Sequence, residues 1–219
     1  MFHLLRVLKS LPITKKKRRH GMVGPPYLWK MKREFQIKFL KDMDLKPDHY
    51  LLDLGCGTLR GGIPIIEYLE IGHYFGIEVR KEVLLEGQKE LLESGQDWKK
   101  PTLLLSPEIT NLKMDQKFDF VWAFSVLPHM SDEILTDNLI FVSDHLTDDG
   151  VFYANVNIDE REEKSWQDFP IVARTFEFYS QRCEESGLSV SCVGTLKDLG
   201  HKSNQKLPDS QTLLKITKI

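Results

Sequence analysis

The 219-residue chain has little cysteine, and the three cysteines that it has form no recognisable site. Cys56, Cys183 and Cys192 are odd in number, and no two of them stand in C-x-x-C spacing. A disulfide framework needs paired cysteines, and a zinc site needs clustered cysteine or histidine ligands. The histidines also lack H-x-H or H-x-x-x-H spacing. The sequence therefore predicts no metal site and a reducing, cytoplasmic setting.

A strong net charge is also lacking, since the formal charge is −2 at pH 7. This balance argues against a nucleic-acid partner, which favours a basic chain. The apolar segment 1–13 is too short to cross a bilayer. A basic run at 15–19 follows it, which is the wrong order for a secretory signal. We interpret residues 1–19 as a flexible arm, a surface helix or a peripheral membrane contact.

Strand and helix patterns alternate from residue 50 onward, which is typical of an α/β sheet with helical crossovers. Short apolar runs predict strands at 50–54, 74–79, 102–105, 118–124 and 151–156. Amphipathic segments predict helices at 27–41, 62–70, 81–93, 132–145 and 171–186. The last two strands, 189–195 and 212–217, are near enough in sequence to pair antiparallel. The pattern predicts a mostly parallel sheet, helices on both faces, and ligands at the carboxyl ends of its strands.

Residues 51–62, LLDLGCGTLRGG, place a glycine-rich turn directly after the first strand. A triphosphate-binding loop needs GxxxxGK[ST], and no lysine follows these glycines. A dinucleotide loop needs GxGxxG, but Arg60 holds the third glycine position and Asp53 would lie beside the pyrophosphate. S-Adenosylmethionine (SAM) carries an ammonium group and no phosphate, so an acidic residue beside the loop is favourable. The loop therefore favours SAM, with an NAD(P)-dependent oxidoreductase as the alternative.

The segment LLDLGCGT resembles the first motif of the class I SAM-dependent methyltransferases. Glu78, at the end of YFGIE, follows the glycine loop at about 20 residues, the spacing at which a carboxylate meets ribose hydroxyls. The segments KFDFVWAFSVLPHMSDE and HLTDDGVFYANV are similar to the family's fourth and fifth strand regions. The resemblance covers Leu45 to the C-terminus. It implies a Rossmann-like three-layer α/β sandwich with seven strands, of which the final one is antiparallel.

The resemblance also implies a domain at 45–219, preceded by a basic arm and lid helices at 1–44. In this family the acidic residue beside the loop serves the SAM ammonium, the glycines admit the methionine moiety, and the acidic strand end binds the ribose. Adenine would lie near the end of the third strand, and the reactive methyl group would point to the end of the fourth. The implied cofactor-binding residues are Asp53, Gly55, Cys56, Gly57, Thr58, Glu78, Val79, Ser106, Phe124 and Ser125.

Three residues are candidates for catalysis. His129 follows the fourth strand and is the candidate general base, since an unperturbed imidazole titrates near neutral pH; the alternative is a structural histidine bonded to a loop carbonyl. Tyr27 and His20 precede the glycine strand, where the family often folds a lid over SAM, and would wall or approach the active site. Their alternative role is packing of the first helix on the sheet. Arg60 would pair with Glu78, hold a carboxylate, or be a surface cation.

The expected function is transfer of the SAM methyl group to a nitrogen or oxygen atom of a small-molecule metabolite. The acidic segment 159–169 and the loop at Gly200 and His201 would contribute to the acceptor pocket. A lipid or quinone acceptor at a membrane surface is the runner-up, because residues 1–19 are apolar and basic. A non-catalytic SAM-binding protein is a further alternative.

Overall fold

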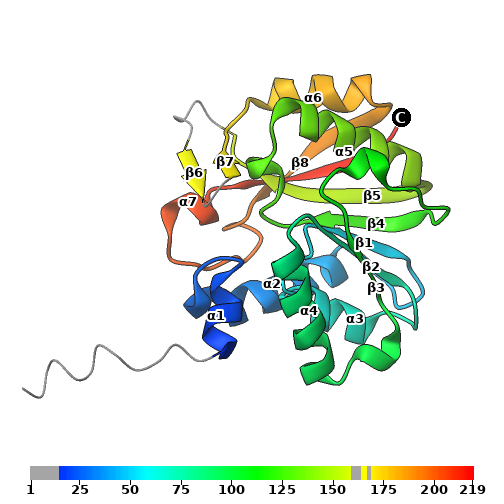
Figure 1. Ribbon diagram of the computed structural model, residues 1–219. Helices are drawn as coiled ribbons and strands as arrows, with labels where there is room; N and C mark the ends of the chain where they lie inside the picture. The colour runs from blue at the N-terminus through cyan, green and yellow to red at the C-terminus, as the bar shows by residue number, and fades with distance from the viewer. Residues whose placement is uncertain (1–14, 159–163, 167–168) are drawn as a thin grey trace, which may run out of the picture.

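The computed structural model describes residues 15–158, 164–166 and 169–219. Its centre is a seven-stranded sheet in the order β3-β2-β1-β4-β5-β9-β8 (Figure 1). Neighbouring strands from β3 to β5 are parallel, and β9 runs antiparallel to both β5 and β8. This confirms the predicted Rossmann-like sheet and its antiparallel final strand. The strands are β1 (Leu51–Leu54), β2 (Tyr74–Glu78), β3 (Thr102–Leu105), β4 (Phe118–Ala123), β5 (Leu146–Val156), β8 (Leu188–Thr195) and β9 (Thr212–Lys218).

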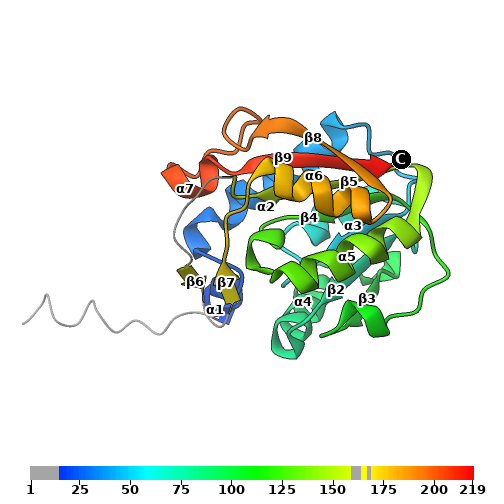
Figure 2. The ribbon, with the colours of Figure 1, turned by 90° about the horizontal axis from the view of Figure 1, so that it is seen from above.

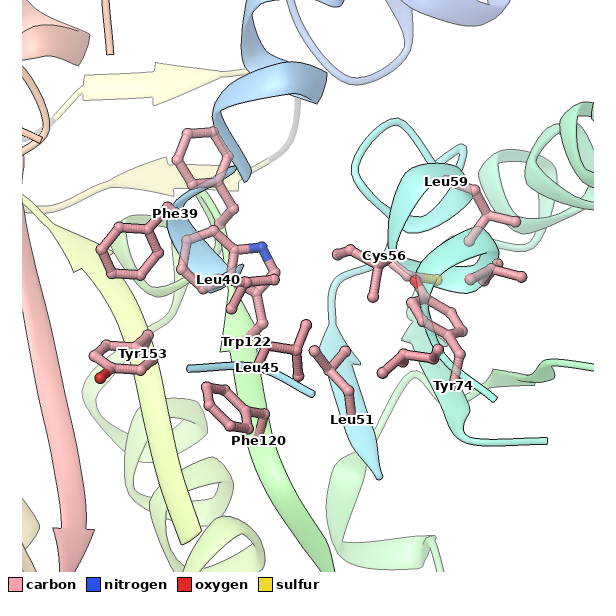
Figure 3. Packing of buried hydrophobic residues seen from close by; sticks show 14 of the residues in the cluster. Phe39, Leu40, Leu45, Leu51, Cys56, Leu59, Tyr74, Phe120, Trp122 and Tyr153 are labelled. Atoms are coloured by element: carbon pink, nitrogen blue, oxygen red, sulfur yellow. The ribbon is translucent and has the colours of Figure 1, made fainter. Parts of the chain in front are cut away.

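Helices cover both faces of the sheet. One face packs against α2 (Trp29–Asp42), α3 (Gly62–Tyr68) and α4 (Lys81–Ser94), and the other against α5 (Asp132–His145) and α6 (Phe176–Glu185). Figure 2 shows α5 and α6 lying over the strands. Figure 3 shows the core on the α2 side, where Phe39 lies between Trp122 and Tyr153 at ring centroid distances of 5.6 and 5.3 Å. Trp122 Nε1 also donates a hydrogen bond to Gln36 of α2, which fixes this helix against β4.

Local sequence explains several element boundaries. Ser131 caps α5 by accepting a hydrogen bond from the Ile134 amide. Gly95 ends α4 with φ of 67°, a left-handed conformation that glycine adopts without a side-chain clash. Leu135, Leu139 and Val142 form the buried stripe of α5, as the periodicity predicted. These helices therefore begin, end and face the core as their sequences indicate.

The helix predicted at 171–186 was wrong at its start. It begins at Phe176, with Thr175 as its cap, and the preceding residues form β7 (Phe169–Ile171), which pairs with β6 (Lys164–Trp166). We call β6 and β7 the hairpin. The strand predicted at 151–156 also begins earlier, because Leu146 already pairs with Phe118 before a register shift in β4. Such pairing depends on a distant partner, so local pattern does not reveal it.

The chain's path across the sheet positions the ligand site. From β1 the chain runs outward to β2 and β3, and it then returns to place β4 on the other side of β1. Loops that leave neighbouring strands in opposite directions open a crevice at the carboxyl ends of those strands. In the described part of the chain, no helix is both long enough and apolar enough to cross a membrane.

Candidate functional site

A cavity of about 610 Å³ lies at the carboxyl ends of β1, β2 and β4. This volume is within the range of roughly 300–1,000 Å³ that small-molecule sites occupy. The structure brings every predicted cofactor-binding residue to the cavity wall: Asp53, Gly55, Cys56, Gly57, Thr58, Glu78, Val79, Ser106, Phe124 and Ser125. His129 lies on the same wall, together with Arg60, Arg80 and Phe169.

The glycine loop after β1 needs residues without side chains. Gly55 and Gly57 have φ of 71° and 60°, which an L residue adopts only with strain. A Cβ atom on Gly55 would come within 2.6 Å of Val126, and one on Gly57 within 2.9 Å of Val23. The amides of Gly55 and Cys56 both donate hydrogen bonds to the Ile77 carbonyl. The loop is therefore tightly curved and held against the end of β2.

Glu78 is buried at the end of β2, and its carboxylate binds both the glycine loop and Arg80. Its Oε2 accepts a hydrogen bond from the Gly57 amide at 3.1 Å. Its Oε1 accepts from the Arg80 amide at 3.0 Å and forms an ion pair with Arg80 Nε at 3.3 Å. A buried carboxylate needs such partners, because leaving it unpaired costs about 5 kcal/mol. The sequence analysis gave Arg80 no role, although its place two residues after Glu78 was a usable signal.

Asp53 is buried in β1 and accepts a hydrogen bond from the Tyr74 hydroxyl at 2.6 Å. Burial, together with the Glu78 charge, raises the pKa of Asp53 to about 7, against the opposing effects of the Tyr74 hydrogen bond and the Arg60 charge. Near pH 7 the carboxyl group is therefore close to half protonated. A cation placed beside it would favour the ionised form. Tyr74 was another residue to which the sequence analysis gave no role.

Arg60 differs from two of the three expectations for it. The side chain is 8% exposed, so the surface-cation prediction was wrong, and the ion pair with Glu78 is made by Arg80 instead. Arg60 Nη1 donates to the Val23 carbonyl at 2.7 Å. Its Nε is buried and has no hydrogen-bond partner among the described residues. Burial lowers the pKa of Arg60 to about 10, so the guanidinium stays charged at pH 7.

Residues 19–24, which we call the strap, cross the glycine loop from the N-terminal side. The strap begins in the last turn of α1 (Lys15–Gly21) (Figure 1). Arg19 is 4% exposed and binds Glu86, Glu90 and Glu93 of α4 at 3.1, 2.6 and 2.7 Å. The Met22 carbonyl accepts from Arg80, and Val23 lines the cavity. The strap is therefore bonded to α4, Arg60 and Arg80 beside the glycine loop.

Of the candidate catalytic residues, only His129 lines the cavity. Its Nδ1 lies 2.8 Å from the Pro170 carbonyl of the hairpin. Burial lowers the pKa of His129, partly offset by this bond, and the Arg80 charge lowers it further. Tyr27 is 71% exposed and bonds Gln205, and His20 stacks on Trp29 at 3.6 Å. The prediction that Tyr27 and His20 wall the active site is therefore not supported, and both secure the N-terminal segment instead.

The loop after β4 carries backbone strain beside the cavity. Ser125 has φ of 60°, which is uncommon outside glycine. Its amide donates to Asn155 Oδ1 at 2.7 Å, and Asn155 is held in turn by Gln211. Strain of this kind persists only where surrounding contacts enforce it. Asn155, which the sequence analysis did not single out, thus fixes the backbone at Ser125.

The expected acceptor segments are only partly visible. Phe169 of the hairpin lines the cavity and lies over Arg80, whose guanidinium carbon is 5.5 Å from the ring centroid. Residues 159–163 and 167–168 of the segment 159–169 lie outside the described residues. His201 is 1% exposed, and its ring centroid lies 5.9 Å from that of Phe124, behind the cavity wall. Within 15–158, 164–166 and 169–219, no cluster of three metal-ligating side chains occurs.

Comparison with known proteins gives a family match and many structural matches. Residues 52–152 match the family model described as a methyltransferase domain. No curated protein matches the chain. An S-adenosylmethionine-dependent methyltransferase from Clostridium acetobutylicum ATCC 824 aligns with a TM-score of 0.64 at 17% identity, covering 87% of this chain and 92% of its own.

Two further solved structures have similar scores. The glycopeptide N-methyltransferase MtfA aligns with a TM-score of 0.66 at 14% identity, covering 85% of this chain and 90% of its own. Magnesium protoporphyrin IX methyltransferase (ChlM) from Synechocystis PCC 6803 with bound SAM aligns with a TM-score of 0.65 at 15% identity, covering 93% and 89%. At these identities the structural matches show a shared fold, and the family match covers the glycine loop, Glu78 and the β4 loop.

Replacement of Gly57 tests the glycine loop. Gly57→Arg places a side chain where φ is 60° and where an added Cβ would already meet Val23 at 2.9 Å. We expect the folded variant to lose measurable SAM binding in calorimetry. Gly72→Arg is the matched control, because its φ of 82° imposes similar strain but no atom lies within 4 Å of an added Cβ. Unchanged SAM affinity in a folded Gly57→Arg protein would contradict the assignment.

Proposed function

Since the chain carries a class I SAM-dependent methyltransferase domain, with SAM as its cofactor, we propose that it methylates a nitrogen or oxygen atom of a small-molecule metabolite. The observation that carries this proposal is the single cavity wall shared by the glycine loop, Glu78, Phe124 and His129. A volume of about 610 Å³ suits SAM with a compact acceptor better than a polymer. MtfA, by its name, methylates a glycopeptide nitrogen, and ChlM acts on a porphyrin, so the fold accommodates discrete molecules.

Within this proposal, the cofactor residues divide by chemistry. The Asp53 carboxylate pairs with the ammonium group of SAM, and the backbone of Gly55 through Thr58 borders the methionine moiety. Glu78 binds the ribose hydroxyls: a carboxylate has about four lone-pair sites, and its contacts with Gly57 and Arg80 leave acceptor capacity. Val79 and Ser106 border the adenine, and Phe124 and Ser125 border the reactive methyl group.

His129 is proposed as the group that receives the acceptor's proton. A carbonyl oxygen can only accept a hydrogen bond, so the contact with Pro170 requires a proton on His129 Nδ1. In the neutral imidazole, Nε2 then carries the lone pair. The lowered pKa keeps the ring neutral at pH 7, as a base must be. Methyl transfer breaks the S–CH₃ bond of SAM, forms the N–CH₃ or O–CH₃ bond, and moves the acceptor proton to Nε2.

The N-terminal segment at 1–44 is proposed as an arm and lid for the domain at 45–219. The bonds of Arg19 to α4 and of Arg60 to Val23 support this role, because they hold the strap over the glycine loop. A peripheral membrane contact through residues 1–19 rests on sequence, since residues 1–14 lie outside the described residues. The low cysteine content supports a cytoplasmic location.

Ligand binding and methyl transfer test the proposal together. We expect SAM and its demethylated product, S-adenosylhomocysteine (SAH), to raise the melting temperature, because a ligand of the native state stabilises it. NAD should have no effect. With methyl-labelled SAM and a cell extract, label should enter the small-molecule fraction. Label in the lipid fraction alone would favour a lipid or quinone acceptor, and no transfer despite SAM binding would favour a non-catalytic protein.

Proton release tests the role of Asp53. Its pKa is about 7 in the free protein, and a bound cation favours the carboxylate form, so SAM binding should release protons from Asp53 near pH 7. Calorimetry in phosphate and in Tris, whose ionisation enthalpies differ, measures this release. We expect Asp53→Asn to lose that component and to bind SAM more weakly. Equal proton release by the wild-type protein and Asp53→Asn would contradict the role.

Replacement of His129 tests the proposed base. His129→Gln keeps a donor for the Pro170 carbonyl but cannot take up a proton at neutral pH. We expect kcat to fall by roughly 10²- to 10⁴-fold, with SAM affinity unchanged. His49→Gln is the control, because His49 precedes β1, at the end of that strand opposite the glycine loop, and its Nδ1 accepts a hydrogen bond from the Lys46 amide. A kcat within twofold of wild type in His129→Gln would exclude this role.

A further inference from the structure

Lys32 is a buried cation without a counter-ion. It lies on α2 and is 8% exposed. Among the described residues, no acidic side chain forms an ion pair with it, and its Nζ faces the Phe124 ring at 5.8 Å from the centroid. Burial and the Arg60 charge together lower the pKa of Lys32 to about 7, against an opposing effect of the Asp209 charge. An unpaired charge in such a place is unfavourable unless an anion joins it.

The acidic residue whose charge acts on Lys32 is already engaged. Asp209 Oδ1 accepts hydrogen bonds from His201 Nδ1 at 2.8 Å, from the Ser203 amide at 3.0 Å and from the Ser203 hydroxyl at 2.7 Å. These bonds hold the Asp209 carboxylate in the segment between β8 and β9. Asp209 Oδ1 is therefore used by His201 and Ser203, and no ion pair joins Asp209 to Lys32 among the described residues.

Arg60 is a second cation in the same part of the molecule. Lys32 lies one helical turn before Gln36, which lines the cavity with Arg60 and would lie 2.4 Å from a Cβ atom on Gly61. The Arg60 charge opposes protonation of Lys32, and both charges oppose protonation of His201. Arg60 lines the cavity, and its buried Nε has no hydrogen-bond partner in the described part of the chain. Two neighbouring buried cations with unused donors repel each other. An anion between them would remove that repulsion and fill the donors.

We propose that Lys32 and Arg60 bind an anionic group of the methyl acceptor, a carboxylate or a phosphate. This inference rests on the proposed function and narrows its acceptor to an acidic small molecule. Position favours the acceptor over the carboxylate of SAM. Lys32 approaches the Phe124 ring at the end of β4, on the side of the 201–209 segment. The backbone of Gly55 to Thr58, assigned above to the methionine moiety, follows β1 next to Arg60, so Lys32 is the cation that distinguishes the acceptor from SAM.

Protonation links this site to pH. Lys32 gains its charge as pH falls through about 7, so anion binding should strengthen over that range and should itself raise the Lys32 pKa. The charged and titratable groups that act on Lys32 are Arg60 of the glycine-loop region and Asp209 and His201 of the β8–β9 segment. Arg60 remains charged and Asp209 ionised throughout, since the pKa of Asp209 is lowered by its hydrogen bonds.

The test uses the SAH complex, in which the cofactor's own carboxylate already occupies its place. Inorganic phosphate and acetate are the probes, added at constant ionic strength, and the readouts are the melting temperature and NMR titration of labelled lysine side chains. We expect both probes to stabilise the complex and to raise the Lys32 pKa. Lys32→Met should weaken the response to phosphate at least about tenfold, the scale of a charge-assisted contact. It should leave SAH affinity within twofold.

Lys30→Met is the matched control, because Lys30 lies on the same helix with its side chain 86% exposed. It should retain the full response to phosphate. Two results would overturn the inference: no response of the wild-type SAH complex to either probe, or a tenfold loss of SAH affinity in Lys32→Met, which would assign the anion to the cofactor. The readouts need no turnover. A protein that keeps Lys32-dependent anion binding but transfers no methyl group would contradict the proposed reaction alone.

Discussion

The Glu78 carboxylate is the group on which the arrangement of the site depends. Its two oxygens bind the Gly57 amide and Arg80, so one buried charge connects the glycine loop to the end of β2. Arg80 extends this connection to the Met22 carbonyl of the strap and to the Phe169 ring of the hairpin. Because a buried carboxylate must stay paired, the loop, strap and hairpin are positioned together.

The sequence predicted the parts of the site that follow from local pattern. The glycine loop and Glu78 could be found because their residue types and spacing are dictated by the strand–turn–helix geometry. The α5 helix at 132–145 and the β3 strand at 102–105 agree with their predicted boundaries. By contrast, the bond from Tyr74 to Asp53 and the burial of Lys32 depend on contacts between distant segments. No periodicity or motif encodes these contacts, and the same is true of the β6–β7 pairing that displaced the start of α6.

The family match covers the glycine-loop part of the site and leaves out the N-terminal and C-terminal segments beside it. The matched residues, 52–152, include the glycine loop, Glu78 and His129. Lys32 and His201 fall outside this range, as does Phe169 of the hairpin. The family match in this part of the chain therefore says little about a methyl acceptor. Its chemistry has to be read from the charges and contacts that this chain builds around Phe124.

The three glutamates that bind Arg19 determine what removal of the N-terminal residues would do to α4. Glu86, Glu90 and Glu93 lie along one side of α4, and Glu90 is 6% exposed. If the chain were cut after the strap, Glu90 would lose its contact with Arg19 and keep Arg33 at 3.9 Å, and Glu86 would keep its ion pair with Lys89. Removing one partner of a buried ion pair typically costs about 3–5 kcal/mol. The helix that carries Arg19 thus contributes electrostatically to the stability of α4, and a shortened protein that lacks Arg19 would lose that contribution.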